Sequence, residues 1–405
     1  MPNPALYDMF APGVIADPYG YYGRLRETDP VHWNERYELW VITRYDDLVW
    51  LTRHHELFSS AVFKNDPRPA YPGIDETDTG LYEYVKGYQA DQFIQHDRPE
   101  HLEMRRVMHG YFTPRSMEAW RPFVQNAVKE LLDAAEAKGE MDVMRDLATP
   151  LPVLVIAEMM GVPSSERIHV RQLAEKLLYI GRGDYDRMKP LTEGMRGMIE
   201  YVSPMVDERL KRPGDDFISV LASGEKRGIF TRHQVLVNTS LLLLAGHETT
   251  INLICNGALA LIRHPEQWTL LQRNPGLAVG ATEECLRYDP PVKSLQRIAA
   301  DDVQLRDVVI RKLDRARWFI TAANRDPAKF PDPDRFDITR DPNPHVAFGS
   351  GIHHCLGATL ARVEGQEAFK ALVQRFPGLE LRTQELEYQP SITFRSVKTL
   401  PVTWN

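Results

Sequence analysis

The longest apolar pattern in the chain covers residues 231–263, TRHQVLVNTSLLLLAGHETTINLICNGALALIR. Its apolar residues recur at helical spacing and surround nearly the whole helix, which predicts a helix buried on all sides. Such a helix has to run through the middle of a large protein. The chain has 405 residues, of which 43% are hydrophobic, so it contains enough apolar material for a large core.

Other helical patterns dominate from about residue 98 to residue 290, and strand patterns lie on either side. The further helices are expected over residues 117–138, 151–160, 164–180 and 187–211. Residues 31–53 predict a β-hairpin followed by a helix, and strands are expected within 301–310, 316–323 and 391–405. Residues 60–93 show no period and are rich in Pro, Gly, Asp and Tyr, which is typical of an irregular functional segment.

No internal repeat or linker is visible, so we expect a single domain over residues 1–405 that is mainly α with a minor β region. The α-rich parts are roughly 95–290 and 355–376, and the β-rich parts are roughly 31–53, 295–323 and 385–405. The net charge of -7 argues against a nucleic-acid partner. With no signal-peptide pattern, no apolar run long enough for a membrane anchor and three cysteines outside any CxxC pair, we expect a cytoplasmic protein.

The sequence AGHETT, residues 245–250, interrupts the long apolar pattern at its centre. Gly246 costs a helix about 1 kcal/mol relative to Ala, and Thr249 can bond back to a carbonyl and bend the helix. An isolated glycine and threonine in a helix usually serve only its packing against neighbouring elements. Here an acid, Glu248, stands beside the alcohol of Thr249, and a carboxyl group in an apolar helix needs a partner or a proton to transfer.

Two charged pairs have helical spacing and are ambiguous on their own. Glu284 and Arg287 lie three residues apart in ATEECLRYDPPV, and such pairs are usually surface ion pairs that contribute little. His101 and Arg105 lie four residues apart in HDRPEHLEMRRVMHGYF. They could clamp an anionic group, or they could simply be surface residues.

Cys355 stands in a glycine-rich turn within HVAFGSGIHHCLGATLAR, residues 345–362, just before a helical pattern. Neither a disulfide nor a protease-like nucleophile is supported by the surrounding residues, and neighbouring His353, His354 and Cys355 suit chelation of one small metal poorly. Backbone N–H groups and the helix dipole at such a position stabilise a thiolate. A thiolate fixed in this way suits the axial position of an iron whose other ligands come from a prosthetic group.

Together these motifs resemble those of the cytochrome P450 family. The matching segments are Phe348-x-x-Gly351-x-His353-x-Cys355-x-Gly357, AGHETT at 245–250, Glu284-x-x-Arg287 and AANRDPAKFPDPDRFD at 322–337. Their order and spacing agree from about residue 15 to the C-terminus. The resemblance implies the family's fold, a triangular prism of helices with haem between the central long helix and the cysteine loop. Where the family has a glycine-rich hairpin, this chain reads RDVVIRKLDRAR, so a different local turn is expected.

The resemblance also implies the roles of individual residues. Cys355 would be the axial ligand of haem b, Thr249 and Glu248 would transfer protons during oxygen activation, and Glu284 and Arg287 would form a buried structural ion pair. The implied propionate clamp consists of His101, Arg105, Arg297 and His353. Other implied haem contacts are Phe348, Gly349, Gly357, Ala245 and Gly246.

The implied activity is a monooxygenase that inserts one oxygen atom from O2 into a bulky apolar molecule such as a steroid, terpenoid or macrolide. Electrons would come from NAD(P)H through a ferredoxin reductase and a ferredoxin, attracted by Arg106, Arg115, His354 and Arg362. Expected substrate contacts are Phe63, Tyr84, Phe93, Ile94, Leu244, Ala245, Val292, Ser294, Leu295 and Phe394. Three alternatives stay open: a peroxide-driven peroxygenase, a non-catalytic haem-thiolate sensor or carrier, and a non-haem enzyme with Cys355 as its nucleophile.

Overall fold

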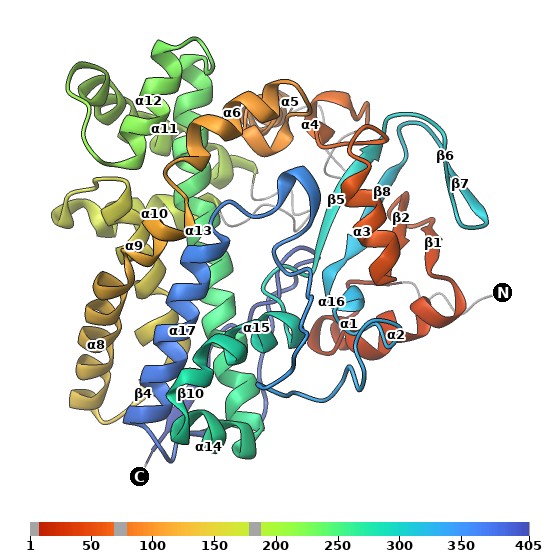
Figure 1. Ribbon diagram of the computed structural model, residues 1–405. Helices are drawn as coiled ribbons and strands as arrows, with labels where there is room; N and C mark the ends of the chain where they lie inside the picture. The colour runs from red at the N-terminus through yellow and green to blue at the C-terminus, as the bar shows by residue number, and fades with distance from the viewer. Residues whose placement is uncertain (1–7, 69–78, 178–187, 405) are drawn as a thin grey trace. The chain divides into compact units, whose positions relative to one another are not determined.

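The computed structural model describes residues 8–68, 79–177 and 188–404 (Figure 1). The chain folds into two compact units, one formed by residues 1–57, 117–152 and 249–405 and the other by residues 58–116 and 153–248. We call them the cysteine unit, which contains Cys355, and the second unit. The single domain expected from the sequence stays a prediction. The prediction of a mainly helical fold with a small β region is confirmed.

Helix α13 (Arg232–Arg263) forms over the long apolar pattern and contributes residues to both units. Side chains along it, such as those of Val237, Ile254 and Leu261, are completely buried. The helix predicted over this pattern is confirmed, and residues 232–263 are helical throughout, including AGHETT. Intrahelical hydrogen bonding and the packing of the flanking apolar turns therefore outweigh the low helix propensity of one glycine and two threonines.

In the cysteine unit, α17 (Ala358–Arg375) packs against α8 (Arg121–Lys138), α14 (Pro265–Arg273) and α15 (Ala278–Tyr288), as Figure 1 shows. Smaller elements complete this unit. They are α1 (Pro12–Ala16), α2 (Tyr19–Thr28), α3 (Tyr45–Arg53), α16 (Ile320–Ala323), the π-helical turn η4 (Met144–Ala148), and the 3-10 turns η7 (Pro275–Leu277) and η8 (Gly351–His353).

The main sheet of this unit has the strand order β1 (Val31–Asn34), β2 (Leu39–Ile42), β8 (Arg315–Phe319) and β5 (Ser294–Ala299). β1–β2 and β8–β5 are antiparallel, and β2–β8 is parallel with Val41 opposite Arg317. Leu39, Val41 and Phe319 of the sheet pack against Tyr22 and Leu25 of α2 in one apolar cluster. The predicted hairpin followed by a helix over residues 31–53 is therefore confirmed as β1, β2 and α3.

Two predicted strands are shorter than expected. Within 316–323 the strand β8 ends at Phe319 and α16 follows, and within 391–405 the strand is β10 (Pro401–Thr403). β10 pairs with β4 (Met141–Asp142) and β9 (Glu380–Leu381), whereas Phe394 makes only an isolated bridge to Val292. Short apolar runs next to turns do not distinguish a strand from a helical turn, which explains both differences.

The second unit contains α6 (Glu100–His109), most of α9 (Pro150–Met159), α10 (Arg167–Leu177), α11 (Met188–Lys211) and α12 (Phe217–Lys226), with α11 packed on α10, α12 and α5. Residues 178–180 and 187 of the predicted helices lie outside the described residues. The remaining elements of this unit are α4 (Val62–Asn65), α5 (Thr79–Ala90), α7 (Pro114–Glu118), β3 (Phe58–Ser59), η3 (Phe93–Gln95) and η5 (Ser164–Glu166).

The segment 60–93 is more regular than its sequence suggests. It contains α4 and the 12-residue helix α5, although residues 69–78 lie outside the described residues. Tyr82, Val85 and Tyr88 of α5 are buried at helical spacing. Two glycines and several polar residues in TGLYEYVKGYQA conceal this spacing in the sequence, and contacts with α11 stabilise the helix.

The hairpin that departs from the family pattern has strained backbone positions. β6 (Val303–Leu305) and β7 (Val308–Ile310) are joined at Arg306, which has a φ of 53°, and Leu313 follows with a φ of 68°. A residue with a Cβ loses about 1–2 kcal/mol in this left-handed conformation. The absence of glycine from RDVVIRKLDRAR therefore leaves a local strain, as the sequence comparison led us to expect.

Replacing Leu313 with Gly should relieve this strain. Leu313 is 39% exposed, so its removal also loses apolar burial, and we expect the two effects to leave Leu313→Gly within about 1 kcal/mol of the unsubstituted protein. Thermal unfolding of the haem-loaded protein measures the change. Lys312→Gly is the control, because residue 312 does not have a positive φ and should become less stable. Equal effects at both positions would contradict the strain at Leu313.

Candidate functional site

Cys355 lies in the turn between η8 and α17, two residues before Gly357, the N-cap of α17. Its N–H donates to the carbonyl of Phe348 at 2.9 Å, and its side chain is exposed. Cys255 and Cys285 are buried, and burial raises the pKa of the Cys285 thiol well above its usual value. Cys355 is therefore the cysteine whose sulfur is accessible and close to a helix N-terminus, where a thiolate is favoured.

Glycines give the Cys355 turn its shape and keep space beside it. Gly349 and Gly351 have φ values of 71° and 72°, and a Cβ on Gly351 would lie 2.2 Å from the carbonyl oxygen of Thr52 in α3. The turn is therefore held closely against α3. At Gly357 the φ is -86° and a Cβ would meet no atom within 4 Å, so neither backbone nor packing requires glycine there.

These residues fit the haem that the sequence implies. An accessible thiol at a helix N-terminus is a suitable donor to iron, and the open space at Gly357 leaves room for a flat macrocycle beside the sulfur. Within the described ranges 8–68, 79–177 and 188–404, no group of three or more His, Cys, Asp or Glu residues could hold a metal ion.

The centre of α13 has one accessible stripe in an otherwise buried helix. Ala245 is exposed, and Glu248 and Thr249, three and four residues further on, are half-buried. The neighbouring His247 and Thr250 are buried. The predicted acid–alcohol pair thus lies on the side of α13 that the protein's own side chains leave uncovered. Thr249 belongs to the cysteine unit, whereas Ala245, Gly246 and Glu248 belong to the second unit.

The four predicted propionate ligands are divided between the two units. Arg297, in β5, and His353, in η8, are half-buried in the cysteine unit. The guanidinium of Arg297 lies 5.3 Å from the centroid of the Trp318 ring and donates to the carbonyl of Gln296 at 2.8 Å. His101 and Arg105 lie one turn apart on α6 in the second unit, where His101 is buried and Arg105 is half-buried.

The expected substrate residues of the second unit have mixed surroundings. Phe93 is buried and stacks on His101 with ring centroids 6.1 Å apart. Its backbone N–H donates a hydrogen bond to the side-chain Oδ1 of Asn238 at 2.8 Å. The guanidinium of Arg196 lies 4.8 Å from the centroid of the half-buried Tyr84 ring. Ile94 is exposed, and Phe63 and Leu244 are half-buried.

The cysteine unit brings Val292 and Phe394 together in an isolated antiparallel bridge, beside the half-buried Leu295. Ser294 has polar surroundings. It is completely buried, and its hydroxyl donates to the carbonyl of Ile392 at 2.7 Å and accepts from Arg317 at 3.0 Å. Side chains alternate along a strand, so Ser294 faces Arg317 on the side opposite Leu295, and its role as a substrate contact stays a prediction.

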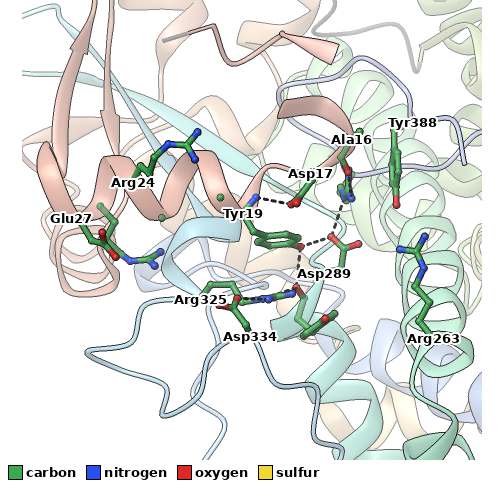
Figure 2. A pocket seen from close by; sticks show the side chains of 15 residues that line it. Ala16, Asp17, Tyr19, Arg24, Glu27, Arg263, Asp289, Arg325, Asp334 and Tyr388 are labelled. Carbon is green, nitrogen blue, oxygen red and sulfur yellow. Dashed lines mark hydrogen bonds and ion pairs between the residues drawn. The ribbon is translucent and has the colours of Figure 1, made fainter. Parts of the chain in front are cut away.

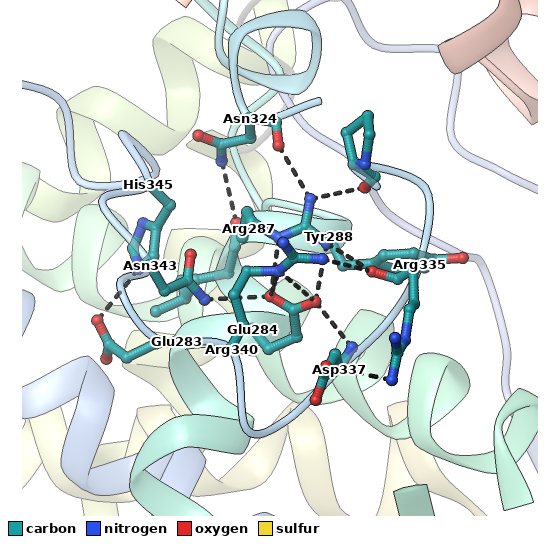
Figure 3. A network of polar contacts seen from close by, with 12 residues as sticks. Glu283, Glu284, Arg287, Tyr288, Asn324, Arg335, Asp337, Arg340, Asn343 and His345 are labelled. Atoms are coloured by element: carbon teal, nitrogen blue, oxygen red, sulfur yellow. Dashed lines mark hydrogen bonds and ion pairs between the residues drawn. The ribbon is translucent and has the colours of Figure 1, made fainter. Parts of the chain in front are cut away.

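Glu284 and Arg287 form a completely buried, two-pronged ion pair, with both N–O distances at 2.8 Å (Figure 3). The guanidinium also donates to the carbonyls of Asn324, Pro333 and Arg335 at 2.7–3.0 Å. Further donors to the carboxylate are the Asp337 N–H, Arg340 and Asn343. The pair thus fixes the segment 324–343, which contains no helix or strand.

Sequence reasoning missed a second polar cluster beside this one. Glu283 accepts two hydrogen bonds from Arg362 and lies 3.1 Å from His345 Nε2. The sequence placed Arg362 only on a face for an electron donor. Glu283 and Arg362 are 79 residues apart, so no sequence spacing indicates that they pair. The only hint in the sequence is that Glu283 directly precedes Glu284 in ATEECLRYDPPV.

A polar hollow of about 680 Å³ lies elsewhere in the cysteine unit and is lined by none of the predicted haem or substrate residues (Figure 2). At its floor the hydroxyl of Tyr19 donates to Asp289 at 2.5 Å, and Arg395 donates to the same carboxylate oxygen at 3.1 Å. Arg395 also donates to the carbonyls of Ile15 and Ala16. These bonds join the N-terminal and C-terminal parts of the unit.

The comparisons agree with this geometry. The sequence profile of the family Cytochrome P450 matches residues 153–399. The chain is 37% identical over 396 residues to the biotin biosynthesis cytochrome P450 of Bacillus subtilis, covering 96% of this chain and 97% of that one. It is 34% identical to the 6-deoxyerythronolide B hydroxylase of Saccharopolyspora erythraea, covering 98% of each.

Among solved structures, P450BioI in complex with a hexadec-9Z-enoic acid-ligated acyl carrier protein superimposes with a TM-score of 0.89 at 34% identity. The match covers 97% of this chain and 99% of that one. The chain belongs to the cytochrome P450 family, and it is a monooxygenase of that family, whose cofactor is haem. Among the described residues, none of the helices combines the length and the hydropathy that a membrane span requires.

One buried acid makes a prediction about pH. Glu364 of α17 is 2% exposed, its Oε2 has no hydrogen-bond partner among the described residues, and burial raises its pKa to about 8. Between about pH 4.5 and pH 8 the unfolded chain releases a proton that the folded chain retains. The contribution of Glu364 to stability should therefore be highest below about pH 4.5 and fall by up to about 1.4 kcal/mol per pH unit as pH rises through this range.

The variant Glu364→Gln cannot titrate at this position. Its thermal midpoint relative to the unsubstituted protein should therefore rise steadily from pH 5 to pH 8. Unfolding curves of both proteins at several pH values give this difference, in which the contributions of all other groups cancel. A difference that stays constant with pH would show that Glu364 is ionised in the folded protein.

Proposed function

We propose that this protein is a haem b monooxygenase in which the thiolate of Cys355 would hold the haem iron. The observation that carries the proposal is the accessible sulfur of Cys355, held by a hydrogen bond to Phe348 in a glycine-shaped turn before α17. When bound, the haem supplies the iron chemistry that activates O2. The amides at the start of α17 stabilise the thiolate, and Gly349 and Gly357 leave room for the macrocycle.

Thr249 and Glu248 manage protons in the proposed reaction. With haem bound, the Thr249 hydroxyl would donate a hydrogen bond during oxygen activation, and the Glu248 carboxyl would exchange protons with solvent. Their shared accessible stripe on α13, bounded by buried residues, supports this role. Ala245 and Gly246 on the same helix keep side-chain volume small there. His101, Arg105, Arg297 and His353 bind the propionates by charge-assisted hydrogen bonds.

The proposed substrate is a bulky apolar molecule that is oxidised at a C–H bond. The half-buried Val292, Leu295 and Phe394 offer an apolar wall in the cysteine unit, and the half-buried Phe63 and Leu244 offer apolar surface in the second unit. Such walls favour apolar ligands. The names of the relatives support this class, because one hydroxylates 6-deoxyerythronolide B and another was crystallised with a fatty-acyl carrier protein.

We further propose that a ferredoxin, reduced by its reductase and NAD(P)H, delivers the electrons. Arg106 and Arg115 are exposed in the second unit, and His354 is exposed beside Cys355 in the cysteine unit. Exposed cations attract an acidic carrier and speed its association. Arg362 contributes less to such a face than the sequence suggested, because Glu283 already offsets its charge.

The ferrous carbonyl spectrum tests the proposed ligand. The haem-loaded protein should show the red-shifted Soret band of thiolate ligation, and Cys355→Ala should lose this band while Cys285→Ala, at a buried thiol, keeps it. Retention of the band in Cys355→Ala would contradict the proposed ligand. Absence of any haem uptake by the unsubstituted protein would contradict the function itself and favour a non-haem role for Cys355.

The variant Thr249→Ala tests the proton role. Haem and substrate should still bind, but product formed per NAD(P)H should fall about tenfold or more, with hydrogen peroxide released instead. Thr250→Ala, at the buried neighbouring position, is the control. The proton role is wrong if Thr249→Ala keeps product and NAD(P)H consumption coupled. Turnover with added peroxide alone, equal in both proteins and faster than with ferredoxin, would favour the peroxygenase alternative.

A further inference from the structure

Glu283 of α15 connects two segments that are distant in the sequence. Its carboxylate accepts a two-pronged pair of hydrogen bonds from Arg362 of α17 at 2.7 and 2.9 Å. One of the same oxygens lies 3.1 Å from Nε2 of His345, whose side chain is only 3% exposed, and Figure 3 shows this contact. Although burial alone would raise it, these hydrogen bonds lower the pKa of Glu283 to about 2. Glu283 is therefore a permanent anion.

Both partners of Glu283, Arg362 and His345, also lie next to the ring of Phe348. The guanidinium of Arg362 lies over the Phe348 ring, 4.5 Å from its centroid. The ring of His345 lies 6.1 Å from the same ring, and its Nδ1 accepts the N–H of Ala347 at 3.2 Å. With Nδ1 accepting, the proton of His345 is on Nε2, where it points at Glu283. Phe348 is thus held by a cation on its ring and by a hydrogen bond one residue before it.

Phe348 in turn holds the proposed haem ligand, because its carbonyl accepts the N–H of Cys355 at 2.9 Å. The contacts therefore form an unbroken chain from Glu283 through Arg362 and His345 to Phe348 and then to the Cys355 backbone. We infer that Glu283 is a positioning residue that fixes the Cys355 turn, and so the sulfur, by orienting Arg362 and His345 against Phe348. This inference rests on the proposed function only in that Cys355 carries the haem.

The planar shape of Arg362 is as important to this arrangement as its charge. A guanidinium donates two parallel hydrogen bonds to a carboxylate while its flat face covers an aromatic ring, and an ammonium does neither. Arg362→Lys therefore keeps the charge and removes the geometry, whereas Glu283→Gln removes the charge and keeps the size. If the pair acted only through its electric field, these two variants would behave differently.

The experiment uses the haem-loaded protein with Glu283→Gln and Arg362→Lys. The measurements are the rate of haem transfer to an excess of a haem-scavenging globin, the thiolate-ligated fraction of the ferrous carbonyl complex, and the reduction potential. Mutation of a residue that orients a metal ligand typically lowers metal affinity or activity about 10–100-fold. We expect both variants to lose haem about tenfold faster, to show a smaller thiolate-ligated fraction, and to shift the potential in the same direction.

Glu367→Gln is the matched control. Glu367 also lies on α17 and pairs with two cations, Arg121 at 2.6 Å and Lys370 at 2.7 Å, and neither of these ion pairs involves a residue of the Cys355 turn. It should lower the thermal midpoint about as much as Glu283→Gln while leaving the haem-transfer rate, the carbonyl spectrum and the potential unchanged. Equal effects of Glu283→Gln and Glu367→Gln on haem transfer would overturn the inference and leave Glu283 a general stabilising residue.

Two other outcomes would also overturn it. If Arg362→Lys matches the unsubstituted protein and only Glu283→Gln shifts the potential, the pair acts through its charge and not by positioning. If both variants retain the haem-transfer rate and the spectrum, the Cys355 turn is fixed without them. If the unsubstituted protein itself shows no thiolate-ligated spectrum, the proposed function is wrong. Failure of the proposed function can therefore be distinguished from failure of this inference.

Discussion

The Glu284–Arg287 pair determines how the cysteine unit can fold. Both side chains are completely buried, and removing two charges from water costs several kcal/mol for each ion. The pair is tolerated because nearly every hydrogen-bonding position is used: the carboxylate accepts from Asp337, Arg340 and Asn343, and the guanidinium donates to three carbonyls. Residues 324–350 contain no helix or strand, so these side-chain bonds replace the backbone ladder that would otherwise fix them.

The consequence reaches the Cys355 turn. The backbone carbonyl of Asn324 accepts a hydrogen bond from Arg287, and its side-chain Oδ1 accepts one from the N–H of Val346 at 2.9 Å. Glu284 therefore anchors the long segment from one side of α15, while the adjacent Glu283 anchors the end of that segment through His345 and Arg362. Two consecutive acids on one short helix hold the approach to Cys355 at two places, and neither touches the sulfur.

Much of this fold follows from local rules that a sequence exposes. The all-round apolar pattern of 231–263 predicted α13, and the alternating residues 31–53 predicted β1, β2 and α3. The helix α5 was missed because Gly80 and Gly87 weaken its pattern and contacts with α11 compensate for them. AGHETT does not end α13 for a related reason: tertiary packing decides whether one glycine interrupts a helix.

The residues of the candidate site likewise fall into those that the sequence predicts and those that only the structure reveals. The sequence predicts four of these residues because each lies in a short, recognisable motif: Cys355, Thr249, Glu284 and Arg287. Glu283, Arg362 and His345 could not be predicted in this way, because their contact depends on two helices and a loop meeting in space. A thiolate ligand needs both kinds of residue. Gly349 and Gly351 allow the turn its positive φ values, but glycines also make a turn easy to deform. Rigidity has to come from outside the turn. The guanidinium of Arg362 over the Phe348 ring and the close approach of Gly351 to α3 supply it.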